Sequence, residues 1–222
     1  MSSAPPKLDV AEDRTVYPIE DDMGESTLQR FISELLRTLV ERWLAERGKA
    51  TFVGADQFFY WEQYNPTRRI APAVYVLPGV APGKAVGVWK VWETGCVPSF
   101  ALEVVSQDVD RHYLASPARY DRLGVDELVM LDPDHALHPT RFLFQVFRKG
   151  KRGLVRVEAT NADRVKSKIL GCHLRAVGVG DDCRVRLGTG INGETLFPTD
   201  AEARAQAEAD TEAYRARAEV GL

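Results

Sequence analysis

The chain has 222 residues, 45% of them hydrophobic and 27% charged, and a formal net charge of −3. Such a chain can bury one substantial core, so we expect a single globular domain with a short appendage. A slightly acidic protein does not bind nucleic acid through bulk charge, and no apolar run is long enough to cross a membrane. The scattered cysteines, Cys96, Cys172 and Cys183, lack metal-site spacing and indicate reduced thiols, which favours a cytoplasmic location.

Three segments are expected along the chain. Residues 1–22 are polar, contain several prolines and lack an apolar signal core, so we predict a disordered leader and no export. Residues 23–197 carry the folded domain. Residues 198–222 form an Ala/Glu/Arg-rich tail, helical or disordered, in which six acidic and three basic side chains lie between Asp200 and Glu219. The tail has no hydrophobic seam that would specify a coiled coil.

The first regular element is predicted as an amphipathic helix over residues 25–48. Apolar side chains recur there at steps of three and four residues, which places them on one face. Ser26 or Thr27 can cap the start of this helix, and Gly48 can end it.

Strands dominate the remainder of the domain. They are predicted at residues 51–53, 57–61, 74–77, 100–105, 127–131, 142–148, 154–158, 173–177 and 184–187, with a loop over residues 80–98. A short helix ending at Leu123-Gly124 separates the strands at 100–105 and 127–131, which implies a parallel pair with a right-handed crossover. Hairpins on either side make the sheet mixed, so the fold class is α/β (α+β).

One carboxylate lies inside an apolar strand. Glu103 is flanked by Phe100-Ala-Leu and Val104-Val105. Burying an ionised carboxylate is costly unless it is paired, and a bound cation is a common reason to keep one in a strand. Glu103 is therefore the first candidate for a functional site. Two alternatives remain, because Glu103 could lie exposed at the strand end or pair with an arginine.

Short motifs with consistent order and spacing extend over about residues 17–195. They are Tyr17-Pro18, Met23-Gly-Glu-Ser26, Ile70-Ala-Pro72, Val80, Lys90-Val-Trp92, Leu102-Glu-Val104, Ser106, Tyr120-x-Arg-Leu-Gly-Val125 and Leu131-Asp-Pro133. Together they resemble the Uma-two family of predicted endonucleases. The resemblance implies the PD-(D/E)xK, restriction-endonuclease-like fold, in which helices flank a mixed central β-sheet, and DNA as the expected partner.

The resemblance also implies a site for Mg²⁺, with Mn²⁺ as an alternative. In the family, an aspartate after the proline and a glutamate on the next strand bind the metal, a lysine activates water, and a glutamate of the first helix supports the site. Hydrolysis of a phosphodiester needs such a hard cation on oxygen ligands. Glu25 and Glu103 match the two glutamates, with Glu103 as metal ligand. Ala73 replaces the metal aspartate and Ser116 replaces the lysine.

Other residues could compensate for these two substitutions. The candidates are Arg119 and Arg111 for the positive charge, and Asp56, Asp108 and Asp110 for the carboxylate. Each also has an ordinary interpretation as a surface, turn or capping residue. Ser116-Pro117 itself fits an N-cap followed by the first helical residue.

Three functions follow from this sequence. The first is a DNA endonuclease that is catalytically impaired. It would use Mg²⁺ if active and no cofactor if inactive. The second is a non-catalytic, nucleic-acid-binding pseudo-nuclease, with the basic run 148–152 as one phosphate contact. The third is a protein-interaction or assembly module that uses the Trp89–Trp92 loop or the tail, with a homodimer as one expected partner. Trp89 and Trp92 could seal a core or a dimer surface, and base stacking on nucleic acid is a further alternative.

Overall fold

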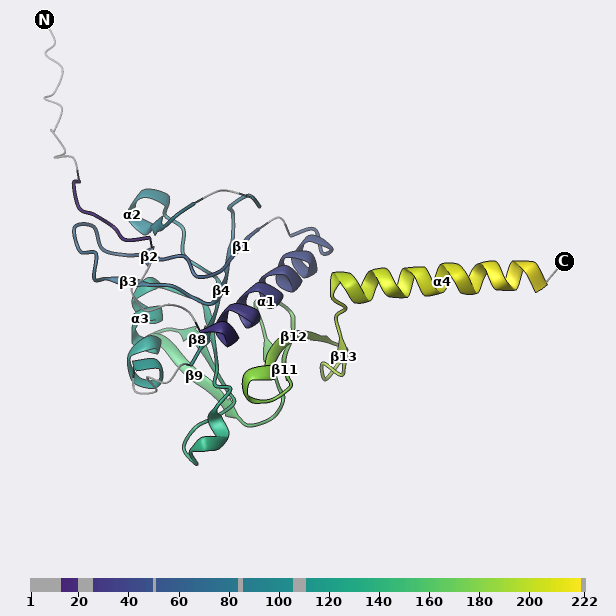
Figure 1. Ribbon diagram of the computed structural model, residues 1–222. Helices are drawn as coiled ribbons and strands as arrows, with labels where there is room; N and C mark the ends of the chain where they lie inside the picture. The colour runs from purple at the N-terminus through teal and green to yellow at the C-terminus, as the bar shows by residue number, and fades with distance from the viewer. Residues whose placement is uncertain (1–12, 20–25, 50, 84–85, 106–110, 221–222) are drawn as a thin grey trace, which may run out of the picture.

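The computed structural model describes residues 13–19, 26–49, 51–83, 86–105 and 111–220 (Figure 1). A six-stranded mixed sheet lies at the centre. Its strands, in spatial order, are β1 (Phe52–Gly54), β4 (Val74–Leu77), β6 (Phe100–Val104), β7 (Glu127–Leu131), β8 (Phe144–Gly150) and β9 (Gly153–Thr160). Strands β6 and β7 are parallel and the other neighbours are antiparallel. Helix α3 (Ser116–Leu123) joins the parallel pair, which confirms the predicted strand–helix–strand unit.

Helix α1 (Thr27–Ala45) covers one face of this sheet. Ser26 caps it, because its side chain accepts a hydrogen bond of 3.1 Å from the Gln29 amide, as predicted. The apolar face of α1 packs on the central sheet together with a second sheet of β10 (Arg164–Ser167), β11 (Cys172–Val177), β12 (Arg184–Thr189) and β13 (Thr195–Leu196). We call this the α1 face. Strands β10 and β13 were not predicted.

The opposite face of the central sheet, which we call the α3 face, carries α3 and a small sheet. That small sheet contains β3 (Arg69–Ile70), β2 (Phe59–Tyr60) and β5 (Trp89–Lys90), and the short helix α2 (Val91–Thr94) follows. The loop predicted over residues 80–98 therefore contains two elements too short to leave a periodic pattern. Trp89 is 1% exposed, which confirms its predicted burial.

The N-terminal segment 13–19 lies against this small sheet. The rings of Tyr17 and Tyr60 have centroids 5.0 Å apart, and the Tyr17 hydroxyl accepts a 2.9 Å hydrogen bond from the Tyr64 amide. The Tyr60 hydroxyl donates to the Pro18 carbonyl at 2.7 Å. Part of the expected leader is thus in contact with the body, while residues 1–12 and 20–22 lie outside the described residues.

Strand β9 forms one edge of the central sheet. A register irregularity lies opposite Val146 and Phe147, and Val155 and Val157 of β9 are about half exposed. The Asp121 carboxylate of α3 accepts a 2.7 Å hydrogen bond from the Leu154 amide, so α3 satisfies one main-chain donor of this edge.

The C-terminal segment is helical, as one of the two predicted alternatives. Helix α4 (Asp200–Val220) projects from the body (Figure 1). Its first turn is attached by ion pairs from Arg186 to Glu202, at 2.6 Å, and from Arg42 to Asp200. No described helix is long and apolar enough to span a membrane. Short 3₁₀ turns complete the structure at His135–Leu137 and Gly180–Asp182.

Candidate functional site

Glu103 is buried on the α3 face of the central sheet. Its strand neighbours Leu102 and Val104 belong to the core under α1, whereas Ala101 and Val105 belong to the core under α3. Side chains alternate along a strand, so Glu103 points toward α3. Only 8% of Glu103 is exposed, and the alternative of an exposed strand end is therefore wrong.

Two hydroxyl groups of α3 donate to the Glu103 carboxylate. The Tyr120 hydroxyl lies 2.5 Å from Oε2, and the Ser116 hydroxyl lies 3.5 Å from Oε1. Burial raises the pKa of Tyr120 well above its usual value, and the negative charge of Glu103 raises it further. The phenol thus stays protonated and donates. Tyr120 was not predicted as a site residue, although its spacing of four from Ser116 places both on one side of a helix.

Ser116 does not cap its helix, contrary to the prediction. The π-helical turn η1 (Arg111–Ala115) runs directly into α3, and Ala115 occupies the N-cap position without a side-chain hydrogen bond. Ser116 is instead the first residue of α3 and is 2% exposed. Because a helical turn already precedes it, the hydroxyl is directed to Glu103 rather than to a helix amide.

Ala73 lies on the other side of Glu103. In the β4–β6 register Val74 is opposite Leu102, and extending that register by one residue places Ala73 opposite Glu103. Ala73 is 1% exposed and packs among apolar residues. Ser116 therefore contacts Glu103, whereas Ala73 is brought level with Glu103 by the extended register and packs with the apolar core under α1.

Two of the compensating candidates lie near this site. Burial and the charge of Glu103 have the largest effects on the pKa of Tyr120, and both raise it. Two smaller effects come from the charges of Arg119, which lowers this pKa, and of Asp56, which raises it. Asp56 has a positive φ of 52°, and its amide donates to the Pro72 carbonyl at 2.9 Å, directly before Ala73. The Arg119 guanidinium donates to the Arg69 carbonyl.

The other sequence candidates lie outside what the structure describes. They are Glu25, Asp108, Asp110 and the side chain of Arg111. Nothing further is assigned to them.

The described side chains around Glu103 do not fit a Mg²⁺ site. Across the described ranges, no group of three acidic, histidine or cysteine residues is placed to hold a metal. Tyr120 and Ser116 bring neutral hydroxyls to the carboxylate of Glu103, and Ala73 carries only a methyl group. Mg²⁺ is bound through carboxylate oxygens, waters and substrate phosphates, and a methyl group supplies no ligand.

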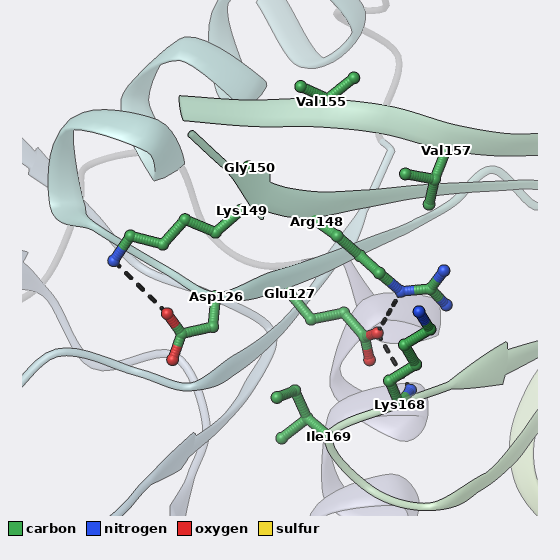
Figure 2. Close-up of a pocket in the computed structure, with 9 residues that line it drawn as sticks. All are labelled: Asp126, Glu127, Arg148, Lys149, Gly150, Val155, Val157, Lys168 and Ile169. Carbon is green, nitrogen blue, oxygen red and sulfur yellow. Dashed lines mark hydrogen bonds and ion pairs between the residues drawn. The ribbon is translucent and has the colours of Figure 1, made fainter. Parts of the chain in front are cut away.

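A second buried carboxylate, Glu127, lies at the start of β7. It is 1% exposed and accepts hydrogen bonds from Arg148 Nε at 2.9 Å, from the Lys168 amide at 3.0 Å and from the Ser167 hydroxyl. Figure 2 shows the contacts of Glu127 with Arg148 and Lys168 in an open groove. Its volume is about 540 Å³, and it is lined by Asp126, Glu127, Arg148, Lys149, Gly150, Val155, Val157, Lys168 and Ile169.

This groove is separate from the Glu103 position. Glu127 pairs with Phe100 at the beginning of β6, whereas Glu103 pairs with Met130 near its end. By alternation Glu127 lies on the α1 face with Val129, and Glu103 lies on the α3 face. The two carboxylates thus point to opposite sides of one sheet, and they cannot act on the same phosphodiester group.

Two residues of the predicted basic run are engaged within the protein. Arg148 pairs with Glu127, and Lys149 Nζ lies 3.0 Å from the Gly124 carbonyl and 3.4 Å from Asp126 Oδ1. These contacts reduce what the run offers to an external phosphate.

The mixed sheet, with α1 on one face and α3 joining the parallel strand pair on the other, is the mixed α/β arrangement that the sequence predicts. The chain belongs to the Uma2 family, described as "Putative restriction endonuclease", whose model matches residues 19–175. This confirms the resemblance to the Uma-two family. The crystal structure of "a putative nuclease belonging to DUF820" from Anabaena variabilis ATCC 29413 is similar, with a TM-score of 0.44 and 10% identity over 66% of this chain and 75% of that chain. No curated protein matches the sequence.

Proposed function

We propose that this chain is a DNA endonuclease of the PD-(D/E)xK type whose Mg²⁺-dependent cleavage is impaired. One observation carries the proposal. Ser116, one of the two positions that depart from the expected pattern, contacts Glu103, and extending the β4–β6 register by one residue brings the other, Ala73, level with Glu103. The substitutions therefore affect the centre of the expected site rather than its periphery.

The chemistry explains why these substitutions matter. Phosphodiester hydrolysis requires a cation that neutralises the phosphate and a group that activates the attacking water. The methyl group of Ala73 cannot ligate a metal, and the neutral hydroxyl of Ser116 cannot supply the positive charge of a lysine. Losing a single electrostatic or proton-transfer group commonly costs a factor of about 10² to 10⁴ in rate.

Cleavage of supercoiled plasmid with Mg²⁺ or Mn²⁺ tests the proposal. Four proteins are compared: the unaltered chain, the double variant Ala73→Asp with Ser116→Lys, the same double variant carrying Glu103→Gln, and the unaltered chain carrying Glu103→Gln. We expect metal-dependent nicking only from the double variant that keeps Glu103. Nicking by the unaltered chain that disappears with Glu103→Gln would contradict impairment and indicate a site rebuilt from other residues.

Binding without cleavage is a second candidate, and the position of Arg119 favours it. Its guanidinium donates to the Arg69 carbonyl, and its positive charge acts to lower the pKa of the Tyr120 hydroxyl. A cation beside the ancestral site can contact a DNA phosphate, and such binding weakens as salt increases. Fluorescence anisotropy with duplex DNA at 50 and 200 mM salt should therefore show weaker binding for Arg119→Gln than for the control Arg204→Gln on exposed α4. Equal affinities for both variants would exclude this role of Arg119.

A further inference from the structure

The contact between Tyr120 and Glu103 joins α3 to the central sheet. Tyr120 is completely buried, Glu103 is 8% exposed, and the hydrogen bond between them measures 2.5 Å. A hydroxyl that donates to an ionised carboxylate forms one of the stronger hydrogen bonds in proteins, particularly where water is excluded. The contact is therefore expected to contribute to the stability of the fold.

A metal site would use the same carboxylate in a different way. Carboxylates gathered for a divalent ion repel one another until the ion is bound, so removing one of them commonly stabilises the metal-free protein. Here an alanine, Ala73, stands where the family resemblance predicts a second carboxylate. The hydroxyls of Tyr120 and Ser116 donate to the carboxylate that remains.

The surroundings of Tyr120 show what this contact positions. Tyr120 packs with Leu123, Val125 and Leu128 in the core between α3 and the sheet. Its hydroxyl reaches Glu103 on β6. A carboxylate at this position fixes where α3 lies along the strand, because an apolar contact alone would tolerate sliding.

We infer that Glu103 has become a structural carboxylate, which fastens α3 to β6 through Tyr120 and Ser116 and requires no divalent ion. This inference rests on the proposed loss of the metal site. It adds that Glu103, one of the two glutamates that match the family pattern, is retained for the stability of the fold.

Urea unfolding of four proteins tests the role of the carboxylate: the unaltered chain, Glu103→Gln, Tyr120→Phe, and the double variant. Each single substitution should lower the folding equilibrium constant about tenfold or more, as for other hydrogen bonds to charged groups. The double variant should lose much less than the product of the two single effects, because both remove the same contact. The control is Tyr75→Phe, at a buried tyrosine whose hydroxyl contacts Gln57 and Trp89. Combined with Glu103→Gln, it should lower the folding equilibrium constant by the product of the two single effects.

Thermal unfolding with and without 10 mM Mg²⁺ or Mn²⁺ provides the second arm. We expect the same melting temperature for the unaltered chain in both conditions. A metal-induced increase that Glu103→Gln abolishes would overturn the inference, as would a Glu103→Gln variant more stable than the unaltered chain. If Glu103→Gln does not fold, the unaltered chain and Tyr120→Phe are titrated with Mn²⁺ in a calorimeter. Measurable Mn²⁺ binding whose affinity changes in Tyr120→Phe would contradict a purely structural role for Glu103.

These outcomes are separable from the test of the proposed function. Metal binding through Glu103 in a chain that does not nick plasmid would refute the inference and leave impairment intact. Metal-dependent nicking that requires Glu103 would refute both.

Discussion

Glu103 and Glu127 are buried glutamates on adjacent parallel strands, yet their surroundings differ. Glu127 on β7 pairs with the guanidinium of Arg148 on β8 and accepts a hydrogen bond from the Lys168 amide, so it connects these three segments. Glu103 accepts hydrogen bonds from the hydroxyls of Tyr120 and Ser116, at the position where the family resemblance predicts a metal ligand. Burial of a carboxylate in an apolar strand therefore does not identify a functional site, because the same pattern describes Glu127.

The largest effect is expected at the ion pair of Glu127. Replacing Arg148 with alanine leaves a carboxylate that is 1% exposed without its cation. Breaking a buried pair from one side costs about 3–5 kcal/mol, so we expect the free energy of unfolding to fall by about 4 kcal/mol in urea titrations. The double variant Arg148→Ala with Glu127→Gln should recover part of this loss. A loss below about 1 kcal/mol for Arg148→Ala would show that Glu127 is not held by charge.

A somewhat smaller effect is expected from restoring the family aspartate alone. Ala73→Asp places a second carboxylate in an apolar environment opposite Glu103, at a position that is now 1% exposed. We expect a loss on the order of 3 kcal/mol, since burial and like charge both disfavour it. Adding Ser116→Lys should recover stability because the ammonium lies between the carboxylates. The free energies of unfolding are measured in urea. If the double variant loses as much stability as the two single variants together, the lysine does not interact with the carboxylates.

A third buried carboxylate, Asp132, separates the effect of a hydroxyl from that of a cation. The Tyr113 hydroxyl donates to Asp132 at 2.7 Å, and Arg141 Nε lies 2.6 Å from the same oxygen. Burial, followed by the hydrogen bond to Asp132, raises the pKa of Tyr113 to about 12. Because Asp132 keeps Arg141, Tyr113→Phe should cost only about 1 kcal/mol in urea unfolding. A cost above that of Tyr120→Phe would reverse the expected order of the two sites.

The smallest effect is expected at an exposed pair. The hydrogen bond from Arg186 lowers the pKa of Glu202 to about 2, below its usual 4.5. A depressed carboxylate pKa stabilises the fold above about pH 4.5, and this contribution is lost as the pH falls toward 2. Glu202→Gln should therefore reduce the free energy of unfolding by less than about 1 kcal/mol at pH 7, which appears as a slightly lower melting temperature. The reduction should become progressively smaller at pH 4 and pH 3. A difference that stays constant over this range would contradict the assignment.

Much of the fold could be predicted because its main elements carry strong local patterns. The boundaries of β4 and β7 match the predicted strands, and Ser26 caps α1 as expected. Strands of two residues, such as β3 and β5, contain no period that a sequence pattern could show. The second sheet also needed tertiary information, because its strands were predicted only in part and without their grouping.

The candidate site was harder to predict than the fold. The pair Ser116-Pro117 matches the sequence pattern of a helix start. In the structure, however, helical backbone already begins in the preceding π-helical turn, so Ser116 is not the first helical residue of this segment. Tyr120 became a partner of Glu103 through the orientation of α3 on the sheet, which sequence spacing does not determine. The ion pair between Glu127 and Arg148 depends on β7 lying beside β8, and the register that places those two residues opposite one another appears only in the folded sheet.

The hydrogen bond from the Leu154 amide to Asp121 has a consequence for self-association. An edge strand with half-exposed valines and open main-chain donors is a template onto which another chain can add. Asp121 lies on α3, one residue after Tyr120, and occupies the Leu154 donor of that edge. Detachment of α3 would therefore uncover both an apolar core and a strand edge at once. In this protein, early loss of structure on the α3 face should lead to β-rich aggregation before the helices unfold, which thioflavin fluorescence during slow heating would detect.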